Sequence, residues 1–209
     1  METTQLLVKV NMDNRPLNVR TEYQDFSQEK LKKIQKSLSK NFSILLFNIR
    51  TSGNLGMTIR SACLMGCKEV IICGRKKYDA RFAVGSEHYV PLVFWETPLR
   101  VTINCLSTGK FEEILEYSPQ EFVKLCDKRT PVFLEQGGQD IQTVKWQTIE
   151  NPLIIVGNES CGIPMDFIKT VKKLLPKTVV TSIPQFSVMR SFNVSIAASI
   201  AMWEIGKNY

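Results

Sequence analysis

Metal ligands are scarce in this sequence. It has one histidine, His88, and its six cysteines include no C-x-x-C pair. A structural zinc site needs four closely spaced cysteine or histidine ligands, so we expect no metal. Several cysteines stand in apolar segments, where a free thiol behaves as a small hydrophobe. A reducing, intracellular compartment, with the cytoplasm favoured, is the simpler expectation. His88 stands in a polar turn and is interpreted as structural or substrate-adjacent, with acid–base work as the alternative.

Long apolar runs are missing as well. No stretch approaches the roughly 18 residues that would span a bilayer, and the N-terminus lacks the apolar core of a signal peptide. No internal repeat or low-complexity tract is visible. With 209 residues, of which 44% are hydrophobic, the chain can bury one good core with or without a small appendage. We therefore expect no membrane association.

Positive charge is what the chain has in excess. Lysine and arginine number 27 against 20 acidic residues, a formal net charge of +7, which favours a polyanionic partner. The segment 26–40 combines spaced apolar residues with Lys30, Lys32, Lys33, Lys36 and Lys40. It predicts an amphipathic helix with a basic face, inside an N-terminal extension over residues 1–41. That face is either simply solvated or an RNA contact.

Helical and strand patterns alternate along the rest of the chain. Helices are expected over 26–40, 54–66, 79–84, 118–128, 164–171 and 191–206, and strands over 43–47, 69–73, 91–95, 131–134, 153–156 and 178–182. This alternation predicts an α/β fold with a mostly parallel sheet flanked by helices. Residues 97–117 are longer than a connection needs and are interpreted as a possible insertion.

The first of three polar loops follows the apolar run 44–47. It holds Asn54, Gly56 and Arg60, and a helix is expected to start near Asn54. Arg60 would then lie nearly two turns inside the helix, four residues from Gly56. A guanidinium beside a glycine would have room for a phosphate or another polar ligand. A solvated surface charge is the plainer interpretation of Arg60.

The second polar loop follows the apolar run 153–156. Gly157 and Gly162 bracket Glu159, and each permits a backbone geometry or a close approach that a Cβ would block. The alternative is an ordinary strand-to-helix turn with Glu159 exposed.

The third loop runs from Ile183-Pro184 into a helix of small residues. A helix start leaves its first backbone N–H groups without partners, and Ser191 and Asn193 stand beside them. An ordinary N-cap is the alternative. Because ligands of open α/β sheets bind at the carboxyl ends of strands, three such loops together favour one ligand site.

In this order the loops resemble the three motifs of the SpoU/TrmH family of RNA ribose 2′-O-methyltransferases, within the SPOUT superfamily. The resemblance covers roughly residues 43–205 and rests on Asn54, Gly56, Arg60, Gly157, Glu159, Gly162, Ile183-Pro184 and Ser191-Phe192-Asn193. The segments 157–159, 162–164 and 183–185 look most like the branch with eukaryotic tRNA (guanosine-18) 2′-O-methyltransferases. Cys161 departs from the pattern, since relatives often carry a charged residue there.

The resemblance implies a methyltransferase domain over residues 42–209 with a deep C-terminal trefoil knot, a rare exception to unknotted topology. It also implies a homodimer whose interface includes the first-motif helix and the C-terminal helix. Ala197, Ala198 and Ala201 would suit that interface, with packing inside the monomer as the alternative.

The implied cofactor is S-adenosylmethionine, bound by the loops of the knot without a metal. The candidate cofactor-binding residues are Leu134, Glu135, Gly157, Asn158, Ile183, Gln185, Met189, Ser191 and Phe192. Adenine recognition would fall mostly to backbone groups, with apolar cover from Ile183 and Met189.

The candidate catalytic residues are Arg60, Asn54, Glu159, Ser191 and Asn193. Family proposals make the residue that matches Arg60 a base. Since an arginine stays protonated in proteins, we interpret it as an anchor for the 5′-phosphate and a stabiliser of the developing alkoxide. In a dimer it would come from the opposite subunit. The other four would position Arg60, the ribose and the loops.

The expected function is methyl transfer to a ribose 2′-hydroxyl of RNA, with a guanosine in the tRNA D-loop favoured. Ribosomal RNA or another tRNA position is one alternative. A non-catalytic RNA-binding relative and a methyltransferase for a small molecule or a protein are the others.

Overall fold

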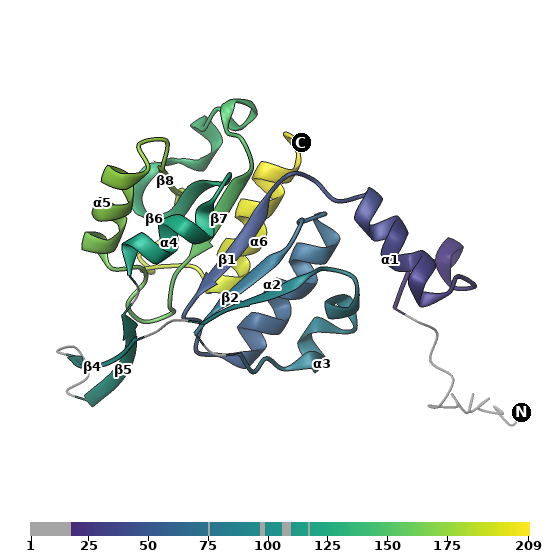
Figure 1. The fold of residues 1–209 in the computed structure, drawn as a ribbon, viewed down its shortest axis with the longest axis horizontal. Coiled ribbons are helices and arrows are strands. Elements are labelled where there is room, and N and C mark those ends of the chain that lie inside the picture. The colour runs from purple at the N-terminus through teal and green to yellow at the C-terminus, as the bar shows by residue number, and fades with distance from the viewer. Residues whose placement is uncertain (1–17, 75, 97–98, 106–109, 117) are drawn as a thin grey trace, which may run out of the picture.

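A six-stranded sheet forms the middle layer of the protein (Figure 1). The computed structural model describes residues 18–74, 76–96, 99–105, 110–116 and 118–209. The sheet strands are β1 (Ser43–Phe47), β2 (Val70–Cys73), β3 (Leu92–Trp95), β6 (Thr130–Asp140), β7 (Pro152–Val156) and β8 (Val179–Ser182). Their order is β3-β2-β1-β7-β6-β8, and every neighbouring pair is parallel. The predicted α/β fold with a parallel sheet is confirmed, whereas the knot stays a prediction.

Helices cover both faces of this sheet. The covering helices are α2 (Ser52–Leu64), α3 (Ala80–Ala83), α4 (Pro119–Cys126), α5 (Met165–Leu174) and α6 (Val194–Gly206), and α1 (Gln28–Ser37) lies away from the sheet (Figure 1). The strands alternate: Ile44 and Leu46 of β1 pack on the side of α2 and α6, and Leu45 and Phe47 on the side of α4 and α5. Two cores therefore sandwich the sheet. In the described part of the chain, no helix is long and apolar enough to cross a membrane.

The small residues of α6 serve the core inside the monomer. Ala198 and Ala201 are fully buried in the cluster between α2, α6 and the sheet. For these two residues, packing inside the monomer is therefore correct. The sides of α2 and α6 that face away from the sheet keep apolar groups exposed: Leu64 is 74% and Trp203 62% exposed.

The helix starts differ from the predicted ones for local reasons. The last helix was predicted from residue 191 but begins at Val194, because the Asn193 carboxamide oxygen accepts from the N–H groups of Ser195 and Ile196. Ser191 and Phe192 consequently belong to the preceding loop. The first-motif helix was predicted from Asn54 but starts at Ser52, which places Asn54 in its first turn.

The predicted basic helix exists as α1, although it is shorter than 26–40. Its one buried residue is Leu31, and its exposed residues include Lys30, Lys32, Lys33 and Lys36. The Gln35 amide donates to the Cys63 carbonyl at 3.1 Å, so α1 is tied to the C-terminal end of α2. Residues 1–17 of the expected extension lie outside the described residues, and the boundary at residue 41 stays a prediction.

Strand β6 continues well beyond the predicted 131–134. It pairs with β8 in two stretches separated by an irregularity between Leu134 and Gln139. A Cβ on Gly138 would come within 2.6 Å of the Thr181 backbone, so only glycine allows this approach. The segment 135–138 forms this irregularity.

Two further strands occupy the predicted insertion. Strands β4 (Leu99–Cys105) and β5 (Lys110–Glu116) form an antiparallel pair that is separate from the main sheet (Figure 1). The remaining residues of 97–117 lie outside the described part, and the interpretation as an insertion stays a prediction.

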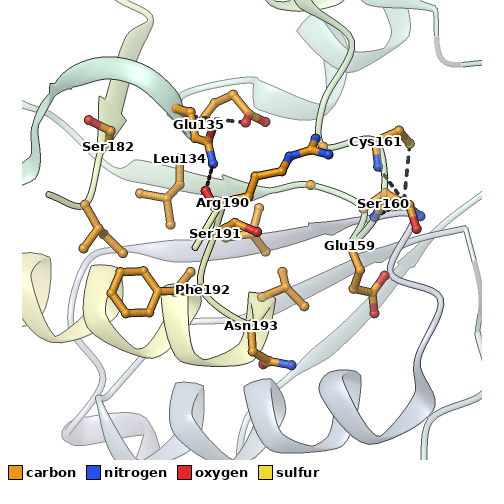
Figure 2. A pocket seen from close by; sticks show the side chains of 18 of the residues that line it. Leu134, Glu135, Glu159, Ser160, Cys161, Ser182, Arg190, Ser191, Phe192 and Asn193 are labelled. Carbon is orange, nitrogen blue, oxygen red and sulfur yellow. Dashed lines mark hydrogen bonds between the residues drawn. The ribbon is translucent and has the colours of Figure 1, made fainter. Parts of the chain in front are cut away.

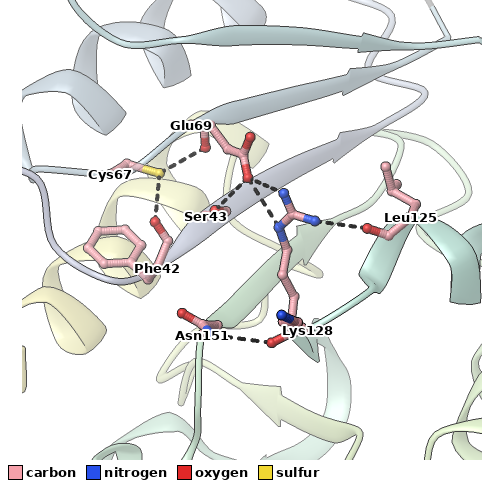
Figure 3. Close-up of polar contacts among 8 residues, drawn as sticks. Phe42, Ser43, Cys67, Glu69, Leu125, Lys128 and Asn151 are labelled. Carbon is pink, nitrogen blue, oxygen red and sulfur yellow. Dashed lines mark hydrogen bonds and ion pairs between the residues drawn. The ribbon is translucent and has the colours of Figure 1, made fainter. Parts of the chain in front are cut away.

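The amino edge of the sheet is joined by an ion pair (Figure 3). Glu69 Oε1 accepts from Arg129 Nε at 3.1 Å and Nη2 at 2.6 Å, and from the Ser43 hydroxyl at 3.1 Å. Arg129 Nη1 also donates to the Leu125 carbonyl at 2.9 Å. Nearby, burial raises the pKa of the Cys67 thiol to about 12. This edge ties β1, β2 and the end of α4 together.

Candidate functional site

A pocket of about 480 Å³ opens at the carboxyl edge of the sheet (Figure 2). Its lining residues belong to three segments. The segment 134–136 lies at the irregularity of β6, and the segments 156–162 and 182–197 begin at the last residues of β7 and β8. The predicted cofactor residues that line it are Leu134, Glu135, Gly157, Asn158, Ile183, Gln185, Ser191 and Phe192. A volume of this size is within the range of about 300–1,000 Å³ that small-molecule sites occupy. The second and third predicted loops thus line one pocket, whereas no residue of the first loop lines it.

Met189 is the predicted cofactor residue that the structure does not bring to the pocket. It is 71% exposed and absent from the lining. The loop is held at Arg190, whose carbonyl accepts a hydrogen bond from the Gln136 amide, and residues 186–189 project outward before that anchor. The expected apolar cover from Met189 is wrong for this structure, and Ile183 and Phe192 form that part of the wall.

Glu159 connects the second motif to the first. Its Oε1 accepts from the Thr51 N–H at 3.0 Å and from Asn54 Nδ2 at 2.9 Å, and its Oε2 accepts from the Arg50 N–H at 2.9 Å. Burial alone would raise the pKa of this carboxyl. The donors, including the N–H of Glu159 itself, outweigh burial and lower the pKa. Glu159 is thus an ionised group held in place, not an exposed turn residue.

Asn54 connects Glu159 to the third motif. Its side chain is buried, it donates to Glu159, and its Oδ1 accepts from Asn193 Nδ2 at 3.1 Å. Asn193 Oδ1 accepts from the N–H of Ser195 at 2.9 Å and caps α6. The alternative of an ordinary N-cap is therefore correct as well, because the Asn193 side chain both caps α6 and bonds to Asn54. Asn54, Glu159 and Asn193, far apart in the sequence, form one continuous network.

The loop after β7 owes its shape to its glycines and Asn158. Asn158 and Gly162 pair across the loop, and Asn158 Nδ2 reaches the Asn48 carbonyl at 2.8 Å. A Cβ on Gly157 would lie 2.5 Å from the Gly162 carbonyl carbon, which only glycine avoids. Cys161, the departure from the family pattern, lines the pocket and donates through Sγ to Asn158 Oδ1 at 3.3 Å.

Glu135 holds the first wall of the pocket against the second. Its Oε2 accepts from the Ile163 N–H at 3.1 Å, and its Oε1 from the Gln136 N–H at 3.2 Å. This carboxylate is therefore engaged with backbone groups; it lines the pocket, and its role in cofactor binding stays a prediction.

Arg60 stands apart from the pocket of its own chain. It is exposed on α2 and is not a lining residue. Within the described residues its guanidinium makes no hydrogen bond or ion pair. The space expected beside Gly56 is not there, because a Cβ at that position would lie 2.5 Å from the Asp79 carbonyl oxygen. Gly56 lets α2 approach the segment before α3, and that prediction is wrong.

Some site groups escaped the sequence reasoning. Arg190 lines the pocket, and its position next to Ser191 was the signal that could have found it. The N–H groups of Arg50 and Thr51 hold Glu159, and no sequence pattern identifies a backbone donor. In the described part of the chain, no three metal-binding side chains cluster, and the absence of a metal stays a prediction.

Comparison with known proteins agrees with this architecture. The model of the SpoU rRNA Methylase family matches residues 41–203. A curated relative, the tRNA (guanosine(18)-2′-O)-methyltransferase TARBP1 of Mus musculus, is 24% identical over 181 residues. The match covers 85% of this chain and 10% of the mouse protein, so this chain corresponds to a small part of it.

Solved structures show the same fold. The A. aeolicus TrmH/SpoU tRNA modifying enzyme superposes with a TM-score of 0.62 at 16% identity, covering 87% of this chain and 83% of that one. The AdoMet-bound rRNA methyltransferase from Sinorhizobium meliloti gives 0.61 at 20% identity, covering 85% and 59%. Because the family model matches residues 41–203, most of the sequence, the chain belongs to the SpoU rRNA Methylase family.

Proposed function

We propose that this protein is an S-adenosylmethionine-dependent RNA ribose 2′-O-methyltransferase, with a guanosine in the tRNA D-loop as its favoured target. One observation carries the proposal: the Asn54–Glu159–Asn193 network joins all three motif loops beside a pocket at the carboxyl edge. A non-catalytic relative would have no need to keep this network, which supports an active enzyme.

The pocket suits S-adenosylmethionine, the cofactor that the S. meliloti relative binds. Leu134, Ile183 and Phe192 offer apolar cover for an adenine, and the polar loop groups around Gly157 offer hydrogen bonds for the ribose and amino-acid parts. When bound, the cofactor supplies an electrophilic methyl group. The chain's residues supply the position of the acceptor and the handling of its charge.

Glu159 is a positioning residue in this proposal. Its oxygens are occupied by N–H donors and its pKa is lowered, so it is a weak proton acceptor near neutral pH. Together with Asn54 it holds the start of α2 against the pocket. Ser191 lies on the pocket wall, where its hydroxyl can contact the bound ligands.

Arg60 completes the site from a second copy of the chain. It is exposed, carries a permanent charge and lies outside its own pocket, and the apolar side chains Leu64 and Trp203 are exposed on α2 and α6. These features support a homodimer through α2 and α6, in which Arg60 of one protomer binds the RNA phosphate and stabilises the developing alkoxide at the other's pocket.

The RNA partner is supported by the net charge of +7 and by the exposed lysines of α1. The tRNA target is supported by the mouse relative, whereas the family description and the S. meliloti relative point to ribosomal RNA. The cysteines that the structure describes are free thiols, which supports a reducing compartment and the cytoplasm.

Two measurements test the proposal. Calorimetry with S-adenosylmethionine and S-adenosylhomocysteine should show binding without added metal, and no heat from a folded protein would count against the cofactor. Incubation with unmodified tRNA and with ribosomal RNA, followed by mass spectrometry of the nucleosides, should show 2′-O-methylguanosine in tRNA. Methylation of ribosomal RNA alone would overturn the tRNA target and leave the chemistry standing.

A further inference from the structure

The loop 185–190 is exposed at its tip, lines the pocket at both ends and is held at Arg190. Gln185 and Arg190 line the pocket, and the Arg190 carbonyl is held by the Gln136 amide. Between them Phe186 is 97%, Val188 104% and Met189 71% exposed. A folded protein seldom leaves neighbouring apolar side chains so open unless a partner covers them.

Arg190 adds a charge to this apolar tip. Figure 2 shows its side chain extending in the pocket from the loop before α6. Within the described residues its guanidinium makes no hydrogen bond or ion pair. Five N–H donors in a planar fork match the oxygens of a phosphate or a carboxylate. An unpaired guanidinium at the pocket therefore indicates an anionic ligand.

These two features fit a single-stranded stretch of RNA better than a second copy of the chain. Single-stranded recognition combines aromatic surfaces that stack on bases with cations that take the neighbouring phosphates. A second copy carries the same net charge of +7 and the same Arg190, and the described residues 185–190 offer it no carboxylate.

We propose that the loop 185–190 binds the RNA strand next to the target nucleotide, with a base stacked on Phe186 and the adjoining phosphate held by Arg190. This inference rests on the proposed function for the identity of the RNA. It gives the pocket a substrate contact from the same protomer, whereas Arg60 is proposed to come from the other one.

The test compares Phe186→Ala and Arg190→Gln with matched controls at the opposite edge of the sheet. Helix α5 starts next to the pocket loop and runs back toward the amino end of β8, which places Lys173 and Leu174 far from the pocket. Both are exposed, so Lys173→Gln and Leu174→Ala remove a charge and an apolar surface without touching the loop.

Binding of unmodified tRNA to the full chain is measured by fluorescence anisotropy at several salt concentrations, without cofactor. Phe186→Ala should weaken binding ~10-fold, the scale for losing one stacked base. Arg190→Gln should lower the slope of log K against log salt by about 0.7–0.9, the value for one lost phosphate contact, and Arg190→Lys should keep the slope. The two controls should stay within about twofold of wild type.

Other outcomes would overturn the inference. Unchanged RNA affinity in both loop variants would exclude the RNA contact. Weaker S-adenosylmethionine binding by Arg190→Gln in calorimetry would assign the guanidinium to the cofactor's carboxylate. A shift to monomer by Phe186→Ala in analytical ultracentrifugation would assign the tip to a second copy. If the wild type binds tRNA through this loop but methylates no RNA, the proposed function fails while the RNA contact stands.

Discussion

Two carboxylates lie at opposite edges of the same sheet, and their partners differ. At the amino edge, Glu69 is paired with the guanidinium of Arg129 and the hydroxyl of Ser43. At the carboxyl edge, Glu159 accepts from two backbone N–H groups and the Asn54 amide. The first arrangement joins neighbouring elements of the fold. The second joins distant loops beside a pocket, so the same type of side chain supports stability at one edge and site geometry at the other.

The difference has a physical basis. An ion pair cancels the charge of both partners, which leaves little net charge for a ligand. Amide donors stabilise an anion and fix its orientation without supplying a counter-charge. Loops organised by Glu159 can therefore be rigid while the adjoining pocket stays open. We therefore expect a substitution at the amino edge to change stability and leave cofactor binding unchanged, and a substitution at the carboxyl edge to change the site.

The largest effect should come from Arg60→Ala, because Arg60 is the residue that the proposed dimer would bring to the pocket of the other protomer. We expect methyl transfer to fall by ~10²-fold or more, the scale for losing a positioned electrostatic group. Dimerisation and cofactor affinity should not change, because the proposed partners of Arg60 are the RNA phosphate and the developing alkoxide. Arg60→Lys keeps the positive charge but lacks the planar guanidinium, so its rate of methyl transfer should lie between those of the wild type and Arg60→Ala. Turnover of Arg60→Ala close to wild type, measured by tritium transfer to tRNA, would remove Arg60 from the mechanism.

The next largest effect should come from Arg129→Gln, which breaks the ion pair at the amino edge. The side chains of Arg129 and Glu69 are 28% and 15% exposed, and the substitution leaves Glu69 without its cation. Removing one partner of a fully buried pair costs about 3–5 kcal/mol, and this partly exposed pair should cost about 2 kcal/mol. Urea unfolding measures the loss, with the exposed neighbour Lys128→Gln as control. Cofactor binding should be retained, and its loss in the folded variant would show that the edges are coupled.

Two glycines of α2 should differ in how much stability the protein loses when each is replaced by alanine. A Cβ on Gly56 would meet the backbone oxygen of Asp79 at 2.5 Å, so Gly56→Ala should destabilise the protein by about 1–3 kcal/mol. A Cβ on Gly53 would meet only the side chain of Phe82, at 3.3 Å, and Gly53→Ala should change stability by less than about 1 kcal/mol. Thermal unfolding of both variants decides the point. Equal effects would contradict the packing role of Gly56.

The smallest effect is a pH dependence at Glu159. Its pKa is lowered in the folded protein, so its contribution to stability is complete above the ordinary carboxyl range and is lost as pH falls through the lowered pKa. Urea unfolding from neutral pH to about pH 2 should therefore show the wild type losing its advantage over Glu159→Gln below about pH 5. If the difference in unfolding free energy between the wild type and Glu159→Gln stays constant over this range, the fold does not stabilise the ionised form of Glu159.

The sequence predicted the fold more securely than the limits of its elements. Runs such as 44–47 and 153–156 are apolar at every position because strands buried on both faces need them, and they identified the parallel sheet. The start of α6 was placed too early, because Asn193 and its neighbours look equally good at a helix start. Only the bonds from Asn193 to Ser195 and Ile196 select the capping residue.

Within the site, the residues Glu159 and Asn193 that the sequence singled out line the pocket, and their roles in catalysis stay predictions. Glu159 between glycines and Asn193 before a small-residue helix pointed to the pocket, and the structure joins them through Asn54. Prediction failed where the same residue type suits both a ligand site or interface and ordinary packing or solvent exposure. Gly56 spaces helices, Ala198 and Ala201 fill the core, and Met189 faces solvent, and none of these choices can be read from local sequence.

By itself, the sequence determined the α/β class, the parallel sheet and the motif residues, because apolar periodicity and loop composition are local properties of the chain. The tertiary structure decided which polar groups meet. Asn54 and Glu159 are 105 positions apart, and only the neighbouring places of β1 and β7 in the sheet bring their loops into hydrogen-bonding distance. It also decided that Arg60 faces away from its own pocket, because the side of α2 that packs against the sheet and α6 excludes a charged side chain.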